Sequence, residues 1–219
     1  TGVQTCALPI FIHLFREGRG IATILFWIVN FMNLLNLYAL SNWLAIVVTD
    51  MGYPAQAVLV STTLQVGGTI GTFGLAWLVA RAGFVRVMSV TFAIAAISIA
   101  LIGQQGLTLP MIFLLVFVAG WCIVGSQPGL NALSGAYYPT YVRSTGVGAV
   151  LGVGRIGAIV GPIIGGLFLA QRMSTRDMFL AAAIPAAVSA AVMFYLRFVV
   201  GPDRKSTRLN SSHIPLSRM

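Results

Sequence analysis

The stretch Gly146-Val-Gly-Ala-Val-Leu-Gly-Val-Gly-Arg-Ile-Gly-Ala-Ile-Val-Gly-Pro162 contains one ionisable side chain, Arg155, in an otherwise apolar and glycine-rich run. A helix that begins near Ser144 rises about 1.5 Å per residue and therefore carries Arg155 roughly 16 Å inward. That depth is about halfway across a hydrocarbon layer of about 30 Å. A charge at such a depth is unfavourable and usually has a function, so Arg155 is the first candidate for a binding residue.

The composition indicates an integral membrane protein. Hydrophobic residues make up 58% of the 219 residues, charged residues make up 8%, and the mean hydropathy is +0.94. A soluble domain of this length could not tolerate so apolar a surface. The formal charge of +9 does not indicate a nucleic-acid partner, because the basic residues are scattered in ones and twos. Cys6 and Cys122 provide neither a disulfide framework nor a metal-ligand cluster, and no cofactor is expected.

The sequences at the two ends of the chain indicate that these end segments do not belong to the natural protein. Residues 1–10 (TGVQTCALPI) can be encoded by a DNA string whose reverse complement translates as DRKSTRLNSS, the sequence of residues 203–212. Two unrelated segments have almost no chance of this antisense relation, and the string resembles a sequencing-library adapter read at both ends of a fragment. We therefore assign residues 1–10 and 203–219 to adapter sequence, and we expect residues 11–202 to be an internal fragment of a protein.

Apolar runs of about 20 residues alternate with short polar or Gly/Pro segments between Ile21 and Val200. We predict six transmembrane spans, at residues 21–47, 56–79, 86–103, 110–134, 144–169 and 178–199. The loops are too short to form a soluble domain. The spans should therefore make one all-α bundle whose polar groups line its interior.

The connecting segments alternate in charge. Most arginines in the connecting segments and at the span ends fall on one side of the predicted bundle: Arg16, Arg19, Arg81, Arg86, Arg143 and Arg197. Arg172 and Arg176 fall on the other side, beside Asp177. The positive-inside rule then predicts that both ends of the fragment are cytoplasmic.

Three spans carry polar residues at helical spacing. These are Asn30, Asn33, Asn36 and Ser41 in the first span, Thr62, Gln65, Thr69 and Thr72 in the second, and Gln127, Asn131 and Ser134 in the fourth. Such faces predict a shared wet cavity, or else hydrogen bonds between helices that are worth about 1 kcal/mol each. Tyr38 and Trp121 are candidates to stack on an aromatic ligand or to anchor at the interface; for Tyr137 and Tyr138 the pattern favours interfacial anchoring.

Glycines recur one turn apart in two spans, at Gly67 and Gly71 and at Gly157, Gly161 and Gly165. This spacing favours close helix packing, and a second interpretation is that the smooth faces let helices slide during a conformational change.

Arg155 has no counter-ion at its own depth in this chain. The acids Glu17, Asp50 and Asp177 lie in loops or at span ends. In one interpretation Arg155 binds a substrate carboxylate, because a planar guanidinium matches a carboxylate with two parallel hydrogen bonds. In the other it has a structural partner, either an acid from helices outside this chain or backbone carbonyls and water. The residue pattern leaves both open.

Three motifs carry a family resemblance: Gly125-Ser-Gln-Pro-Gly-Leu-Asn-Ala-Leu133, Tyr138-Pro-x-x-x-Arg-Ser-Thr-Gly-Val-Gly148, and Leu151-Gly-Val-Gly-Arg-Ile-Gly-Ala-Ile-Val-Gly-Pro162. Together they resemble the aromatic acid:proton symporters of the major facilitator superfamily. The resemblance covers residues 11–202 and implies one half of a major facilitator fold, helices 7–12 of a twelve-helix transporter in a bacterial inner membrane. It also implies three partners beyond the lipid bilayer: a missing N-terminal six-helix half, a small aromatic acid and a proton.

The resemblance implies roles for particular residues. Arg155 would hold the substrate carboxylate, Tyr38 or Trp121 would stack on the ring, and the ring substituents would be bonded by Gln127, Asn131, Asn33 and Gln65. Arg81 and Arg143 would belong to the cytoplasmic gate, although Arg143 is equally well explained as a positive-inside anchor. The family's gate motif Gly-x-Leu-x-Asp-Arg-x-Gly has an aspartate, which pairs with neighbouring charges and helix ends, where this sequence has Ala80. The resemblance then implies that gating on this side cannot use that ion pair, and that Arg81 relies on another acid or only anchors the loop.

A facilitator for a sugar acid, a drug or a dicarboxylate is the alternative, and competition by benzoate-like against aliphatic acids would separate the two. An enzyme is not expected, because the predicted spans contain no His, Asp or Glu and Cys122 has no basic neighbour. Proton coupling needs a titratable group near the site, and the predicted spans offer none.

Overall fold

The computed structural model describes residues 14–15, 19–104 and 106–200, and within them every regular element is a helix. The six helices are α2 (Gly20–Asp50), α3 (Ala57–Ala82), α4 (Phe84–Ile102), α5 (Leu109–Tyr137), α6 (Arg143–Ala170) and α7 (Thr175–Val200). All six are long and apolar enough to cross a membrane. The predicted all-α architecture of six spans is confirmed.

The helices extend past several predicted span ends. For example, α2 continues to Asp50 rather than ending at residue 47, and α5 continues to Tyr137 rather than ending at residue 134. Hydropathy marks only the part of a helix inside the hydrocarbon layer, whereas backbone hydrogen bonding continues into the polar headgroup region. Several predictions lie outside the described residues: Cys6, Arg16, Glu17 and the adapter ranges 1–10 and 203–219. The adapter assignment stays a prediction.

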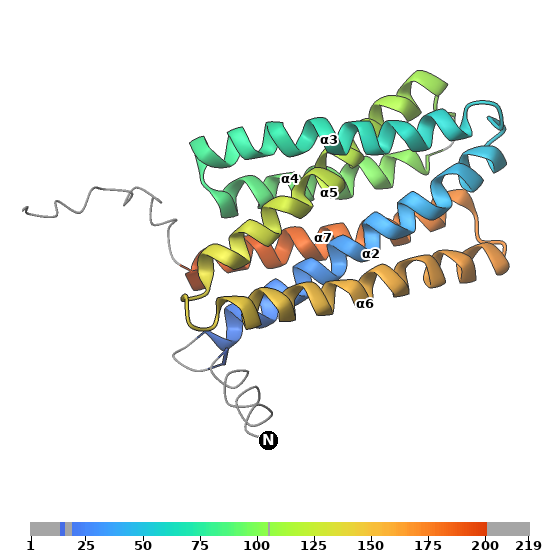
Figure 1. The fold of residues 1–219 in the computed structure, drawn as a ribbon. Coiled ribbons are helices and arrows are strands. Elements are labelled where there is room, and N and C mark those ends of the chain that lie inside the picture. The colour runs from blue at the N-terminus through green and yellow to red at the C-terminus, as the bar shows by residue number, and fades with distance from the viewer. Residues whose placement is uncertain (1–13, 16–18, 105, 201–219) are drawn as a thin grey trace, which may run out of the picture.

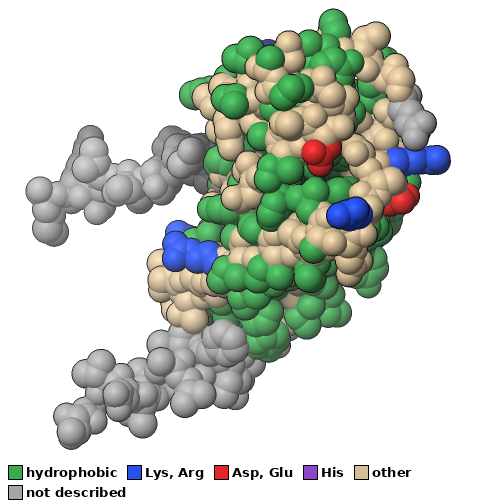
Figure 2. Space-filling model, turned by 90° about the vertical axis from the view of Figure 1, so that its right-hand side faces the viewer, with side chains coloured by type: hydrophobic (Ala, Val, Ile, Leu, Met, Phe, Trp, Pro, Cys, Tyr) green, Lys and Arg blue, Asp and Glu red, His purple; other side chains and the backbone are tan. Residues whose placement is uncertain are grey.

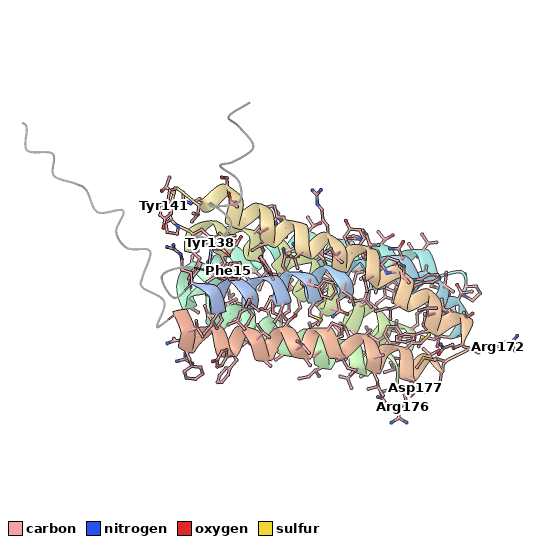
Figure 3. All side chains as sticks on the ribbon, turned by 90° about the horizontal axis from the view of Figure 1, so that it is seen from below. Phe15, Tyr138, Tyr141, Arg172, Arg176 and Asp177 are labelled. Carbon is pink, nitrogen blue, oxygen red and sulfur yellow. The ribbon has the colours of Figure 1, made fainter. Side chains whose placement is uncertain are left out.

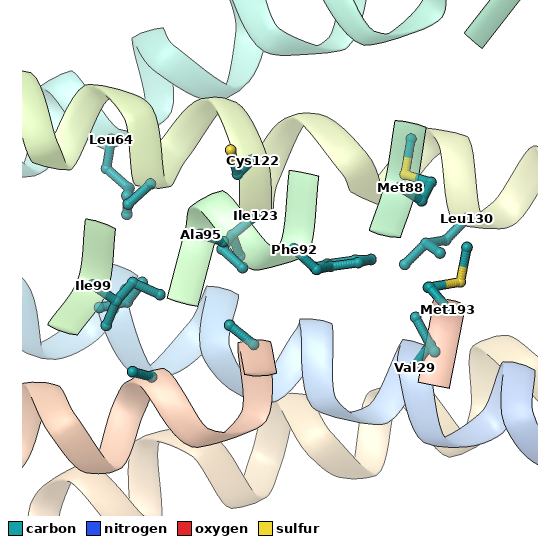
Figure 4. Close-up of a cluster of buried hydrophobic side chains, with 14 of the residues drawn as sticks. Val29, Leu64, Met88, Phe92, Ala95, Ile99, Cys122, Ile123, Leu130 and Met193 are labelled. Carbon is teal, nitrogen blue, oxygen red and sulfur yellow. The ribbon is translucent and has the colours of Figure 1, made fainter. Parts of the chain in front are cut away.

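The six helices pack in three close pairs, α3 with α5, α2 with α6, and α4 with α7. In addition, α4 packs on α5 and α7 packs on α2, so that α4 and α7 back the other helices (Figure 1). Buried side chains such as Phe92, Ile99 and Ile123 fill the space between the helices (Figure 4).

Glycines allow close backbone approaches between α3 and α5 and between α2 and α6, as the packing interpretation of their spacing predicts. A Cβ on Gly71 in α3 would lie 2.6 Å from the carbonyl oxygen of Trp121 in α5. On α6, Gly157 and Gly161 face the backbone of α2 at Phe31 and Leu35. The glycine faces are therefore contact surfaces within this bundle, and sliding along them stays a prediction.

The two ends of the bundle carry different residues. Tyr138 and Tyr141 lie at one end, and Arg172, Arg176 and Asp177 lie at the opposite end (Figure 3). Figure 2 looks onto one end of the bundle, where isolated charged side chains lie among hydrophobic and uncharged ones. Large apolar residues such as Phe73 and Phe198 are 75% and 69% exposed, which suits a protein whose solvent is lipid.

A single residue, Gly83, joins α3 to α4. Its φ of 86° lies in the region that glycine adopts without strain. The chain therefore reverses within one residue at this end of the bundle.

We expect Gly71→Ala to destabilise the protein, because its Cβ would meet the backbone of Trp121, which cannot move without separating α3 from α5. Overpacking of this kind costs about 1–3 kcal/mol. Gly148→Ala is the matched control, since nothing lies within 4 Å of a Cβ there and alanine gains up to about 1 kcal/mol of helix propensity. The measurement is the fraction of monodisperse protein after heating in detergent. Equal melting temperatures for the two variants would contradict this packing.

Candidate substrate-binding site

Gln127 is the centre of a cluster of amides that joins α2 to α5. Its Oε1 accepts a hydrogen bond from Nδ2 of Asn33 at 2.6 Å. Its Nε2 donates to Oδ1 of Asn30 at 2.9 Å and, more weakly, to Oδ1 of Asn131 at 3.5 Å. We call these four residues the amide cluster. The polar faces predicted on the first and fourth spans therefore meet.

Backbone carbonyls extend the amide cluster. Asn30 donates to the carbonyl of Val150 in α6 at 2.8 Å, and Asn33 donates to the carbonyl of Ile123 at 3.3 Å. Asn30 and Asn33 are each 1% exposed, whereas Gln127 and Asn131 are half-buried. The cluster thus stabilises the helix packing, as one of the two interpretations predicts. Among the described residues Oδ1 of Asn33 finds no partner, so the cluster keeps one free acceptor.

Arg155 lies near the middle of α6 at the level of the amide cluster. The residue before it, Gly154, faces α2, and a Cβ there would lie 2.8 Å from Nδ2 of Asn30. The Arg155 side chain is exposed, and it forms no hydrogen bond or ion pair with any residue that the structure describes. A bare guanidinium at mid-span is unfavourable against lipid, which indicates that this part of α6 faces water or another polar surface.

Tyr38 and Gln65 lie on the exposed surface of α2 and α3. Tyr38 is 43% exposed. Gln65 donates through Nε2 to Oγ of Ser41 at 3.3 Å, which links the two helices. Ser41 follows Asn33 by eight residues, or about 12 Å along the helix axis. Gln65 therefore lies well to one side of the amide cluster, and Tyr38 lies between the two groups.

Trp121 lies on a different side of α5 from the amide cluster. Its ring packs on Gly74 of α3, and it lines a groove of about 480 Å³ between α3, α4 and α5, together with Arg86 and Cys122. Six residues separate Trp121 from Gln127, which turns their side chains about 120° apart around a helix. The structure does not bring Trp121 to the amide cluster. The six-residue spacing in the sequence already predicts that Trp121 and Gln127 point to different sides of the helix.

The two arginines expected in the cytoplasmic gate make local contacts. The guanidinium of Arg81 lies 4.0 Å from the ring centroid of Trp77, one turn earlier in α3. Arg81 thus has a cation–π partner in its own helix. Residue 80, an aspartate in the family motif, is an alanine here and can form no ion pair. Arg143 donates through Nε to the carbonyl of Tyr138 at 3.3 Å, which fixes the short connection before α6.

Tyr138 was expected to anchor at the membrane interface, and that expectation is wrong. Its side chain is 1% exposed, and its hydroxyl donates to Oγ1 of Thr23 at 3.1 Å. The ring packs on Gly146 of α6. Burial raises the pKa of Tyr138, so this hydroxyl stays protonated. Tyr138 thus joins the ends of three helices, a role that spacing along the sequence does not reveal.

We expect Gln127→Leu to destabilise the protein by about 1–3 kcal/mol, because it leaves the buried Oδ1 of Asn30 without a partner and removes one of the two acceptors of Nδ2 of Asn33. Gln65→Leu is the matched control, because its exposed amide makes one weak hydrogen bond and its loss should change stability little. Melting of the two purified variants in detergent measures the difference. A Gln127→Leu variant as stable as Gln65→Leu would show that the cluster does not stabilise the helix packing.

Comparison with known proteins places the chain in a family. Residues 26–217 match the model of the Major Facilitator Superfamily. The chain is 34% identical to a gallate transporter of Pseudomonas putida, over 81% of the chain and 40% of that protein. It is 35% identical to a benzoate transport protein of Acinetobacter baylyi, over 84% of the chain and 39% of that protein.

A 4-hydroxybenzoate transporter of Pseudomonas putida is 31% identical, over 84% of the chain and 41% of that protein. The chain thus spans about two fifths of the length of these relatives. Together with six apolar helices in one bundle, the family match identifies an integral membrane protein. The chain belongs to the Major Facilitator Superfamily.

Proposed function

We propose that this chain is the C-terminal half of a secondary transporter that takes up a small aromatic carboxylate together with protons. Relatives that it matches over more than four fifths of its length are named as transporters of gallate, benzoate and 4-hydroxybenzoate. It spans about two fifths of each of them, which leaves room for a second bundle. The two bundles would rock about a shared site at mid-membrane depth.

The observation that carries this proposal is the unpaired guanidinium of Arg155 beside the amide cluster. At this depth a carboxylate is the partner that suits it, because two parallel charge-assisted hydrogen bonds satisfy both groups. Hydrogen bonds to charged groups contribute about 1.5–3 kcal/mol, which corresponds to roughly 10- to 100-fold in affinity. The face of α6 that carries Arg155 would then turn toward the second bundle rather than toward lipid.

The remaining candidates divide according to their position. Gln127 and Asn131, which are half-buried, would bond hydroxyl groups on the ring, since they lie at the level of Arg155. The buried Asn33 would act through its hydrogen bond to Gln127. Tyr38 would stack on the ring, because its side chain is accessible on the same bundle surface. Gln65 would contact only a longer or displaced substrate, and Trp121 would support α3 rather than the ligand.

Proton coupling in this proposal depends on the other half of the transporter. Within the described helices the only carboxyls are Asp50, the last residue of α2, and Asp177, in the first turn of α7. Neither lies at the depth of Arg155. The titratable group would therefore come from the N-terminal bundle.

We propose further that the protein lies in a bacterial inner membrane with the end that carries Arg81 and Arg143 in the cytoplasm. The positive-inside rule supports this orientation, because most of the arginines in the connecting segments and near the helix ends belong to that end. Arg81 and Arg143 would then hold the cytoplasmic mouth through the local contacts described above.

The decisive variant is Arg155→Gln in the full-length protein, assayed for uptake of radiolabelled 4-hydroxybenzoate by cells or proteoliposomes. We expect KM to rise roughly 10- to 100-fold, because the charge-assisted hydrogen bonds are lost. Arg155→Lys should recover part of the affinity, since an ammonium keeps the charge and loses the planar fork. Arg176→Gln, at an exposed position near the start of α7, is the control and should transport normally. A wild-type KM in Arg155→Gln, at equal membrane expression, would show that Arg155 does not bind the substrate carboxylate.

A further inference from the structure

A second cavity lies between α2, α6 and α7, apart from the face that carries Arg155. Its volume is about 320 Å³. Apolar side chains such as Trp43, Phe168 and Phe179 form most of its wall. The three helices run side by side in Figure 3, with α2 between the other two. We call this space the α7 cavity.

Asn36 is the exception in this apolar wall. Its side chain is 0% exposed, and neither Nδ2 nor Oδ1 has a hydrogen-bond partner among the described residues. Its neighbours in α2 behave differently, because Asn30 and Asn33 are held in the amide cluster. A buried amide that leaves both its donor and its acceptor unused requires an explanation, since nearly all buried polar groups in proteins are paired.

The rest of the wall limits what can satisfy Asn36. The indole of Trp43 already donates to the carbonyl of Pro162 at 2.9 Å, so it is not available. Pro185 has no N–H to offer the carbonyl of Ala181 one turn earlier, and both residues line the cavity. Asn36 therefore contributes one unpaired amide donor and one unpaired amide acceptor to a wall that is otherwise apolar.

The residues that line the α7 cavity favour a neutral ligand. None of the described residues that line the cavity is charged, so a carboxylate would lose its hydration without gaining a cation. A lipid acyl chain would fill the space and leave Asn36 unsatisfied. A protonated carboxylic acid carries a donor and an acceptor side by side and can exchange two hydrogen bonds with a primary amide. A dry cavity of about 150 Å³ is known to accept benzene, so the α7 cavity has room for an aromatic acid.

We propose that the α7 cavity binds the protonated form of a small aromatic acid, with Asn36 paired to the carboxylic group. The identity of the acid rests on the proposed function, whereas the preference for a neutral aryl ligand rests on the cavity alone. The chain would then hold two separate sites, one for the anion at Arg155 and one for the neutral acid at Asn36.

Benzamide tests this proposal because it is neutral at every relevant pH and presents the same donor and acceptor. Binding of radiolabelled benzamide is measured by equilibrium dialysis on the full-length protein in nanodiscs at pH 7. We expect saturable binding that weakens at least tenfold in Asn36→Leu. Ala182→Phe, which fills the cavity from α7 and leaves Asn36 in place, should also weaken binding at least tenfold.

Two controls make the result specific. Ala191→Phe places the same ring on an exposed position of α7 and should leave benzamide binding unchanged. Arg155→Gln should also leave it unchanged, while it weakens benzoate binding at pH 8. Ala182→Phe decides the question if Asn36→Leu does not fold.

The opposite results overturn the proposal. If benzamide does not bind saturably, or binds equally well in Asn36→Leu and Ala182→Phe, the α7 cavity holds water at most. The test is independent of the transport assay. Loss of benzamide binding in these variants would support the cavity site even if 4-hydroxybenzoate uptake were absent, and normal uptake without benzamide binding would refute the cavity site alone.

Discussion

The interior of a membrane supplies no water, so each polar group of a spanning helix must find its partner inside the protein. This constraint explains most of the structure. Backbone groups are paired within the helices, Asn30 and Gln127 bond each other across helices, and Trp43 bonds the carbonyl of Pro162. Against this background two side chains at mid-span stand out, because none of their polar atoms has a partner among the described residues: the guanidinium of Arg155 and the amide of Asn36. Both functional proposals begin from these two unsatisfied groups.

The two groups differ in charge and in accessibility, which assigns them different ligands. Arg155 is exposed and cationic, and it suits an anion that arrives from water. Asn36 is buried and neutral, and it suits a molecule that has already lost its charge. An aromatic acid exists in both forms, and its protonation state selects between the two environments. The same substrate class is therefore compatible with both sites.

Much of the fold follows from local patterns in the sequence. Hydropathy located the six helices, because each span must be apolar over a length set by the bilayer, and the spacing of Gly67, Gly71, Gly157 and Gly161 predicted close packing. The amide cluster was anticipated as a set of polar faces. Its connections were not, since pairing between α2 and α5 depends on tertiary packing. For the same reason the burial of Tyr138 and the packing of Trp121 on Gly74 appeared only in three dimensions, although helical spacing already placed Trp121 and Gln127 on different sides of α5.

The one-residue connection at Gly83 affects how the bundle can move. Two helices joined by a long loop can shift along their axes independently, whereas α3 and α4 have no slack between them. A displacement of either helix must be transmitted to the other or unwind its terminal turn. In the proposed rocking cycle α3 and α4 would move together at this end, and the hinges would lie in the longer connections elsewhere in the chain.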